Sequence, residues 1–307
     1  MSSTDVYSAE PALPRLATSF LSRPETEDSS LKSRDDPSQR WNLRRDMEAG
    51  IQRGANGVFK CGTVIGFSKL RGKIRDDDFE CVGEVPRLLL SSLLWQETES
   101  SVFIIHPSNY AAFAPETLLA SLLTSPHHQP APTREHAIQR LNNVQLLSIF
   151  DLPSAVRAIS SVSERLNELQ KSRRTSPVLF IIAGLDTFTE ATIRASNPVK
   201  GAALLQSTLR TLTRLSRVYA AFLSVMLVNT SGVGKSPGTG TPSDPSSDHI
   251  HSVFHTVGSL FPTLLMRTLD QGIDTHLLLS TVKGAQVVEV VKDRVGDGVG
   301  KWCIWKA

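Results

Sequence analysis

Residues 228–248 read VNTSGVGKSPGTGTPSDPSSD and contain residue types that bind phosphate. A P-loop follows the pattern Gly-x4-Gly-Lys-Ser/Thr, in which backbone N–H groups and the lysine hold the phosphates. Gly232, Gly234 and Lys235 match the region of this pattern, but Asn229 occupies the position of its first glycine. The Pro, Gly and Ser residues after Ser236 also cannot begin the helix that a P-loop requires. The pattern therefore favours a mobile loop at the carboxyl edge of a sheet, where α/β proteins bind ligands.

The composition indicates a folded intracellular protein. The chain has 307 residues, of which 40% are hydrophobic, and a net charge of +3 that permits a nucleic-acid partner without requiring one. The three cysteines are far apart in the chain, so neither a disulfide framework nor a zinc site is expected. No apolar run approaches the roughly 18 residues of a membrane span. The histidines at 127, 128, 249, 251 and 255 have no supporting Cys or carboxylate frame, so no metal site is predicted.

Short apolar runs alternate with helical patterns, which is typical of an open, mostly parallel sheet covered by helices on both faces. Strands are predicted at residues 62–67, 101–106, 144–150, 177–183 and 222–228. Helices are predicted at residues 85–96, 115–123, 154–169 and 203–220. The last two have apolar stripes that are expected to face the core: Val156, Ile159, Val162, Leu166 and Leu169 in one, and Leu205, Leu209, Leu212, Leu215 and Tyr219 in the other. Three closely spaced runs at 276–281, 286–294 and 302–305 indicate terminal strands that are partly antiparallel.

The domain organisation is predicted from changes in composition. Residues 1–45 are rich in Ser, Pro, Asp, Glu and Arg without apolar periodicity, which indicates a disordered tail. Residues 46–307 form one α/β domain, with mobile loops expected near 72–80, 125–135 and 231–250.

The order of these features resembles the RecA-like P-loop NTPase core of the eukaryotic strand-exchange recombinases and their paralogues, the Rad fifty-one group. GTVIGFSKLRGKI matches the first strand and phosphate loop, and PVLFIIAGLDTF matches the strand that ends at the magnesium-site Asp. LLQSTLRTLTRLSRVYAAFLSVMLVNTSG matches a long helix and a strand that ends in a polar sensor residue. The resemblance covers roughly residues 47–305 and includes the closing strands. It implies that residues 231–250 occupy the slot of a DNA-binding loop.

The chain departs from the family's pattern at both nucleotide motifs. Gly66 is separated from Gly72 and Lys73 by one residue too many, and Ile74 has no hydroxyl for magnesium. Ala183 occupies the position of the magnesium-site Asp, and Asp186 follows three residues later. No convincing catalytic glutamate is found, and Glu97 and Glu99 are candidates only by their proximity to the next strand. No Ser/His/Asp or Cys/His arrangement has supporting context in the sequence.

The resemblance and the departures together define the candidate site residues. A remnant nucleotide site would use Gly66, Gly72, Lys73, Asp186 and Asn229, so binding of ATP and magnesium stays an open alternative to no cofactor. A nucleic-acid site would use Gly232, Gly234 and Lys235 together with an arginine stripe of Arg210, Arg214 and Arg217. The alternative for the stripe is a solvated helix face.

Three functional hypotheses follow. The first is a non-catalytic recombinase paralogue in the nucleus, a subunit of a hetero-oligomer that helps a recombinase assemble on single-stranded DNA in homologous-recombination repair. The second is an active DNA-dependent ATPase of the RecA family. The third is a protein-binding scaffold that makes no contact with DNA.

Overall fold

The structure is a computed structural model. It describes residues 41–49, 51, 57–70, 80–124, 132–172, 176–234, 252–254, 260 and 263–306. These residues all belong to one compact unit, Ser38–Ala307. The described strands form one eight-stranded sheet in the order β3-β2-β4-β5-β1-β6-β7-β8. The strands are β1 (Val64–Lys69), β2 (Ser101–Pro107), β3 (Val144–Ile149), β4 (Val178–Ala183), β5 (Leu223–Val228), β6 (Thr275–Val282), β7 (Ala285–Asp293) and β8 (Trp302–Lys306).

The sheet is mostly parallel, as the sequence predicts. β1 to β6 pair in parallel, whereas β7 is antiparallel to both β6 and β8. The runs VLFIIA in β4 and LSVMLV in β5 are buried at every position. Continuous apolar runs of this kind are expected where helices cover both faces of a strand.

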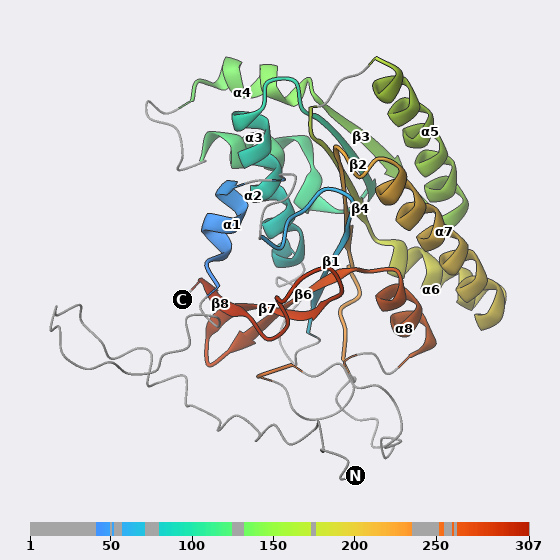
Figure 1. Ribbon diagram of the computed structural model, residues 1–307. Helices are drawn as coiled ribbons and strands as arrows, with labels where there is room; N and C mark the ends of the chain where they lie inside the picture. The colour runs from blue at the N-terminus through green and yellow to red at the C-terminus, as the bar shows by residue number, and fades with distance from the viewer. Residues whose placement is uncertain are drawn as a thin grey trace, which may run out of the picture. The chain divides into compact units, whose positions relative to one another are not determined.

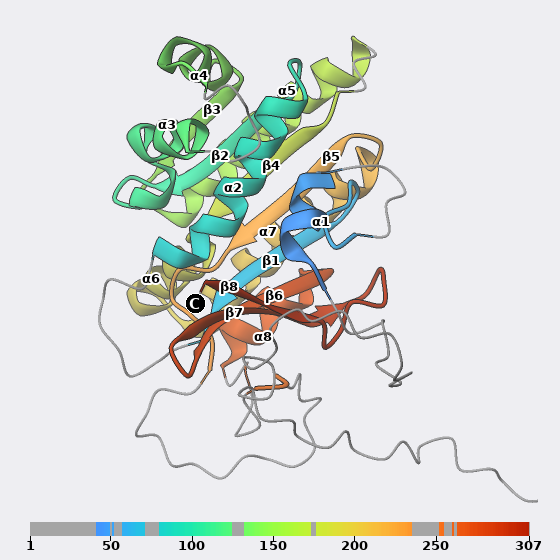
Figure 2. The ribbon, with the colours of Figure 1, turned by 90° about the vertical axis from the view of Figure 1, so that its left-hand side faces the viewer.

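Helices divide between the two faces of the sheet, as Figures 1 and 2 show. One face packs against α1 (Leu43–Ala49), α2 (Glu80–Gln96), α3 (Pro115–Leu123) and α4 (Arg134–Leu141). The other face packs against α5 (Leu152–Lys171), α6 (Leu185–Ala195), α7 (Pro198–Val218) and α8 (Leu264–Gln271). A short 3-10 helix, η4 (Ala111–Phe113), precedes α3.

The two long helices contact the sheet through one apolar stripe each. The predicted stripe of α7 is confirmed, because Leu205, Leu209, Leu212, Leu215 and Tyr219 are all buried. For α5 the prediction is wrong at one position, since Val156 is 38% exposed. The helix begins earlier than predicted, at a capping box in which Asp151 and Ser154 bond each other's backbone N–H groups. Leu152, in this earlier first turn, and Ala155 are both buried in the core.

Two segments that the sequence predicts to be irregular are partly helical. Residues 43–45 fall within the predicted tail but form the first turn of α1, with Leu43 buried against the sheet. Residues 134 and 135 fall within a predicted loop but begin α4, which is capped by the Thr133 side chain. The rest of the predicted tail, residues 1–40, and most of the three predicted loops lie outside the described residues. Among the described residues, no helix has both the length and the apolarity that a membrane crossing requires.

Candidate functional site

The carboxyl ends of β5 and β1 are the most promising place for a ligand in this topology. β1 is followed by α2 on one face of the sheet, whereas the connection after β5 contains α8 on the opposite face. Neighbouring strands whose connections leave toward opposite faces open a crevice at their carboxyl ends, and open α/β sheets bind ligands there. Asn229 directly follows β5 at this edge, and Ser68 lies near the end of β1.

Gly66 does not have the loop position that the first glycine of a phosphate loop normally has. It lies inside β1, where it pairs with Leu227 of β5 and His276 of β6. A Cβ atom at this position would overlap the Ile273 side chain. The glycine is therefore needed because the segment before β6 approaches β1 closely, and not because a loop must bend around phosphate. Gly72 and Lys73 lie outside the described residues.

The Gly-Val-Gly stretch runs alongside the end of β1. Val233 forms a parallel bridge with Leu70, and its N–H donates to the Lys69 carbonyl oxygen at 2.7 Å. The Gly234 N–H donates to the Leu260 carbonyl oxygen at 2.8 Å. Gly232 and Gly234 both have a positive φ, of 73° and 99°. Because the N–H groups of Val233 and Gly234 already bond protein carbonyls, they do not form a phosphate cradle; Lys235 lies outside the described residues.

Asp186 connects α6 to the turn after β5. The chain leaves β4 through Gly184, whose φ of 79° allows a tight turn into α6. The Asp186 carboxylate is 1% exposed and accepts hydrogen bonds from the Ser231 N–H at 2.5 Å, the Ser231 hydroxyl at 2.6 Å and the Thr230 hydroxyl at 3.2 Å. Both oxygens of this carboxylate are thus engaged by protein groups. The geometry supports a structural role for Asp186 rather than the magnesium contact considered from sequence.

Five buried polar side chains form a hydrogen-bonded series that runs from Asn229 to Lys292 and is called the polar chain below. The Asn229 Nδ2 donates to the Ser68 Oγ at 2.7 Å, and that hydroxyl lies 2.7 Å from the His276 Nε2. The His276 Nδ1 lies 3.0 Å from one Asp270 oxygen, and the Lys292 Nζ donates to the other at 2.8 Å. Each of the five residues is at most 8% exposed. Strands β1, β6 and β7, helix α8 and the residue after β5 each contribute one member to this polar chain.

Electrostatics hold the Asp270 end of the polar chain ionised. Burial opposes charge on Asp270, but the contacts with His276 and Lys292 outweigh it and lower the pKa of the carboxyl. Burial also lowers the pKa of Lys292, although the Asp270 contact partly offsets this. A buried ammonium and carboxylate in direct contact compensate each other, which is the condition for charges to persist in a protein interior.

Ser68, His276 and Asp270 have the relative geometry of a catalytic triad, which sequence reasoning missed. Ser68 and His276 are 208 positions apart, and no motif connects them. Triads are recognised by geometry and access rather than by sequence order. Here Ser68 is 0% exposed and its hydroxyl is bonded to Asn229. No substrate reaches this oxygen in the described structure, so the arrangement does not support nucleophilic catalysis.

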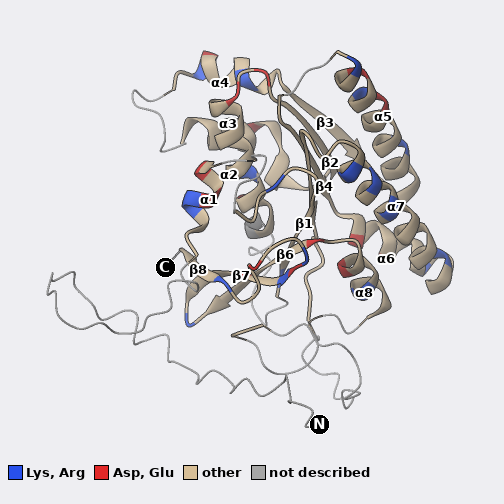
Figure 3. Cartoon of the chain, in the orientation of Figure 1, with Lys and Arg blue, Asp and Glu red and all other residues tan. Residues whose placement is uncertain are grey.

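The arginine stripe leads away from this edge of the sheet. α7 runs from the carboxyl edge back to the start of β5, so Arg210, Arg214 and Arg217 approach the amino edge in turn; Figure 3 shows the basic residues along α7. Arg217 donates to an Asp274 oxygen at 2.7 Å and to the Gly62 carbonyl oxygen. Asp274 in turn accepts from the Val64 N–H at 2.8 Å. Arg217 therefore binds the residues that flank the start of β1. It does not lie close to Gly232 and Gly234, which are at the opposite edge of the sheet.

The remaining candidates do not form a site. Glu97 and Glu99 are exposed in the turn before β2, at the opposite edge of the sheet from Asn229. The five histidines considered for metal binding lie outside the described residues, and the ranges that the structure covers contain no group of three or more metal-ligating side chains. Burial raises the pKa of the Cys303 thiol to about 11, as expected for an unreactive packed cysteine.

No protein-family model matches the chain, and a search of curated proteins finds no significant match. The fold and the geometry of the described residues therefore carry the functional argument.

Proposed function

We propose that the chain is a non-catalytic paralogue of the RecA-like strand-exchange recombinases. In this proposal it is a nuclear accessory subunit that helps a recombinase assemble on single-stranded DNA during homologous-recombination repair. The observation that carries the proposal is the position of Gly66 within β1. An eight-stranded, mostly parallel sheet with antiparallel terminal strands is compatible with a RecA-like core, whereas the glycine that would open its phosphate loop is an internal strand residue.

The replacement of both magnesium-contacting residues supports the absence of ATP hydrolysis. Phosphoryl transfer depends on positioning and on neutralisation of charge by the metal and a lysine. Ile74 replaces the hydroxyl residue, Ala183 replaces the acidic residue, and the Asp186 carboxylate is engaged by Thr230 and Ser231. Loss of both metal contacts is expected to raise the barrier by several kcal/mol.

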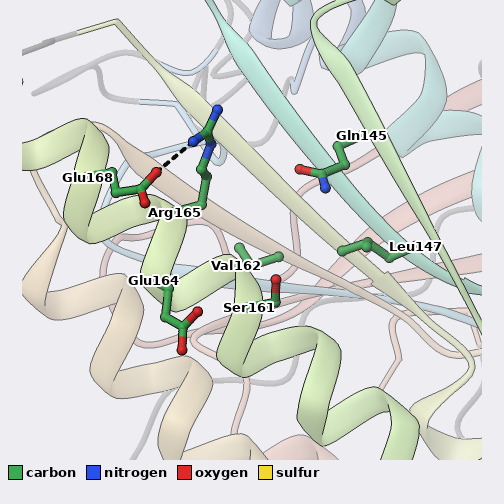
Figure 4. Close-up of a pocket in the computed structure, with 7 residues that line it drawn as sticks. All are labelled: Gln145, Leu147, Ser161, Val162, Glu164, Arg165 and Glu168. Carbon is green, nitrogen blue, oxygen red and sulfur yellow. Dashed lines mark hydrogen bonds and ion pairs between the residues drawn. The ribbon is translucent and has the colours of Figure 1, made fainter.

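The edge strand β3 supports a role as a subunit. Among the described strands it pairs only with β2, so one row of its backbone groups is available for strand addition. A groove of about 300 Å³ lies beside it against α5 (Figure 4), and it is lined by Gln145, Leu147, Ser161, Val162, Glu164, Arg165 and Glu168. Phe150, at the end of β3, is 78% exposed. An extended segment of a recombinase or of another paralogue fits such an edge.

A pure scaffold is the second candidate, because Arg217 is occupied by Asp274 at the amino edge of the sheet. Salt dependence separates the two candidates. DNA binding through several Lys and Arg contacts weakens steeply as salt increases. Binding of single-stranded DNA at low salt that disappears at high salt supports the DNA-contacting subunit, and no binding at low salt supports the scaffold.

The direct test is recombinase filament assembly on single-stranded DNA already coated with a single-strand-binding protein. The full chain, purified with its partner subunit, is expected to accelerate assembly while releasing no phosphate itself. Phosphate release is compared between the unmodified chain and the Lys73→Ala and Lys235→Ala variants. No effect on assembly contradicts the proposal, and phosphate release that either variant abolishes supports the active ATPase instead.

A further inference from the structure

With a neutral His276 ring, the polar chain from Asn229 to Lys292 has one allowed direction of hydrogen bonding. An ionised carboxylate only accepts hydrogen bonds. Asp270 accepts from Lys292 at one oxygen, so its other oxygen requires that the His276 Nδ1 carry a hydrogen. We consider the neutral ring, which leaves no uncompensated charge in this buried site because Lys292 already balances the Asp270 charge.

The protonation of His276 then determines the direction of the hydrogen bonds at Ser68 and Asn229. A neutral imidazole with hydrogen on Nδ1 has an acceptor at Nε2, so the Ser68 hydroxyl must donate to it across the 2.7 Å contact. Ser68 has only one hydrogen, and its oxygen is left to accept. The amide group of Asn229 must therefore direct Nδ2, and not its carbonyl oxygen, toward Ser68.

We propose that Asp270 is a positioning residue for Asn229: acting through His276 and Ser68, it fixes the orientation of the Asn229 carboxamide at the carboxyl end of β5. This inference goes beyond the proposed function, because it applies to any ligand that binds at the edge between β5 and β1. An amide has a donor side and an acceptor side, so its orientation decides which ligand groups it can bond. By thermodynamic reciprocity, a ligand that favours the opposite orientation of the Asn229 amide also favours the reversed hydrogen bonds at His276 and Asp270.

Asp270→Asn is the sharpest test because Lys292 dictates how the new amide must lie. The Lys292 Nζ keeps hydrogens to donate whether or not it is charged, so the oxygen of the new amide is expected to face Lys292 and its NH2 group to face the His276 Nδ1. The ring must then carry its hydrogen on Nε2 and donate to Ser68. Ser68 donates onward, and the Asn229 amide must rotate to accept. One isosteric change is thus expected to reverse every bond from position 270 to Asn229.

The experiment uses ¹⁵N nuclear magnetic resonance on the full chain, since the nitrogen shifts of a histidine ring report which nitrogen carries hydrogen. The His276 signals are assigned by their loss in His276→Gln, and the Asn229 side-chain NH2 signals by their loss in Asn229→Ala. The expected result is hydrogen on Nδ1 in the unmodified chain and on Nε2 in Asp270→Asn, with a clear shift of the Asn229 signals. Asp297→Asn is the matched control, because Asp297 is 97% exposed and outside the polar chain, and it is expected to change neither set of signals.

Three results overturn the inference. They are hydrogen on Nε2 in the unmodified chain, hydrogen on both ring nitrogens, and a His276 switch in Asp270→Asn that leaves the Asn229 signals unchanged. Ser68→Ala provides a second test should Asp270→Asn fail to fold. It is expected to shift the Asn229 signals while the His276 hydrogen stays on Nδ1, and unshifted Asn229 signals would contradict the role of Ser68. These spectroscopic outcomes are independent of whether the chain affects filament assembly.

Discussion

The Oγ of Ser68 lies 2.7 Å from the Nε2 of His276, although 208 positions separate the two residues. The contact exists because β1 and β6 are parallel neighbours in the sheet, with Gly66 opposite His276. It also brings the end of β1, the residue after β5 and helix α8 into one set of bonded polar groups. The topology favours this edge of the sheet for ligands. The residues beneath it are therefore held by the buried polar chain as well as by apolar packing.

Replacing Gly66 with Ala is expected to destabilise the fold. A Cβ atom there meets the Ile273 side chain, and overpacking of this kind costs about 1–3 kcal/mol. Adding Ile273→Val is expected to recover part of this loss, because the two residues are in direct contact and should couple. Urea unfolding of the two single variants and the double variant measures the coupling. Unchanged stability in Gly66→Ala would place this glycine in a loop after all.

Replacing Asp274 with Ala is expected to lower the free energy of unfolding by about 2–3 kcal/mol, because it removes the acceptor of the Val64 N–H and one of the two acceptors of Arg217. Arg217→Ala is expected to cost only about 1 kcal/mol, since its side chain is 47% exposed. The exposed Arg210 provides the matched control, and Arg210→Ala should stay within about 0.5 kcal/mol of the unmodified chain. If urea unfolding shows equal stability for all three variants, the contacts of Arg217 at the start of β1 do not stabilise the fold.

Replacing Glu289 with Gln tests a buried carboxyl that contacts the Ser252 hydroxyl at 2.6 Å and the Val253 N–H at 2.5 Å. Burial raises the pKa of Glu289 above the ordinary value of 4.5, although these hydrogen bonds partly offset it. The folded state therefore binds the proton more tightly than the unfolded state, and the stability from this carboxyl falls as pH rises from about 4.5 through the folded pKa.

Glu289→Gln should remove this slope, so the free energy of unfolding of the variant should rise relative to that of the unmodified chain as pH increases from about 4 to 7. Urea unfolding at a series of pH values measures the difference. Glu99→Gln changes an exposed residue in the same way and should show no pH-dependent difference. A gain that is equally large for both variants would indicate a general effect of net charge.

Replacing Phe150 with Ala separates folding from partner binding. The side chain is 78% exposed, so the stability should change by no more than about 0.5 kcal/mol. If β3 accepts a partner strand, the loss of an aromatic anchor beside it should weaken binding of the recombinase or paralogue by about 2 kcal/mol. Surface plasmon resonance with the partner immobilised measures the affinity. Val199→Ala is the control, because Val199 is 75% exposed but lies at the start of α7, and equal weakening by both variants would argue against the β3 edge.

The sequence predicts the sheet well because its central strands are continuous apolar runs. VLFIIA and LSVMLV have no polar positions apart from one serine, and both are buried on each face. The antiparallel end of the sheet is also predicted, since short strands in close succession leave no room for a crossover helix. Short helices such as α1 and α4 are missed because seven or eight residues show little periodicity.

The candidate site is much less predictable from sequence. The predicted strand at residues 62–67 includes Gly66, but only the approach of Ile273 shows why a glycine is needed at this position. Ser68 and His276 are single polar residues in apolar strands, a pattern that does not reveal that they contact each other. Asp270 and Lys292 form their ion pair only because α8 packs against β7 in the folded protein. Long-range contacts between unrelated positions leave no local signal in one sequence.

The most direct test of the central claim, a RecA-like fold with an eroded nucleotide site, is calorimetric titration of ATP with magnesium into the full chain. We predict no magnesium-dependent heat of binding, because Gly66 lies inside β1 and the Asp186 carboxylate is already engaged by Thr230 and Ser231. Clear magnesium-dependent binding, lost in Lys73→Ala or Lys235→Ala, would contradict it and show that one of the two Gly-Lys segments still binds phosphate.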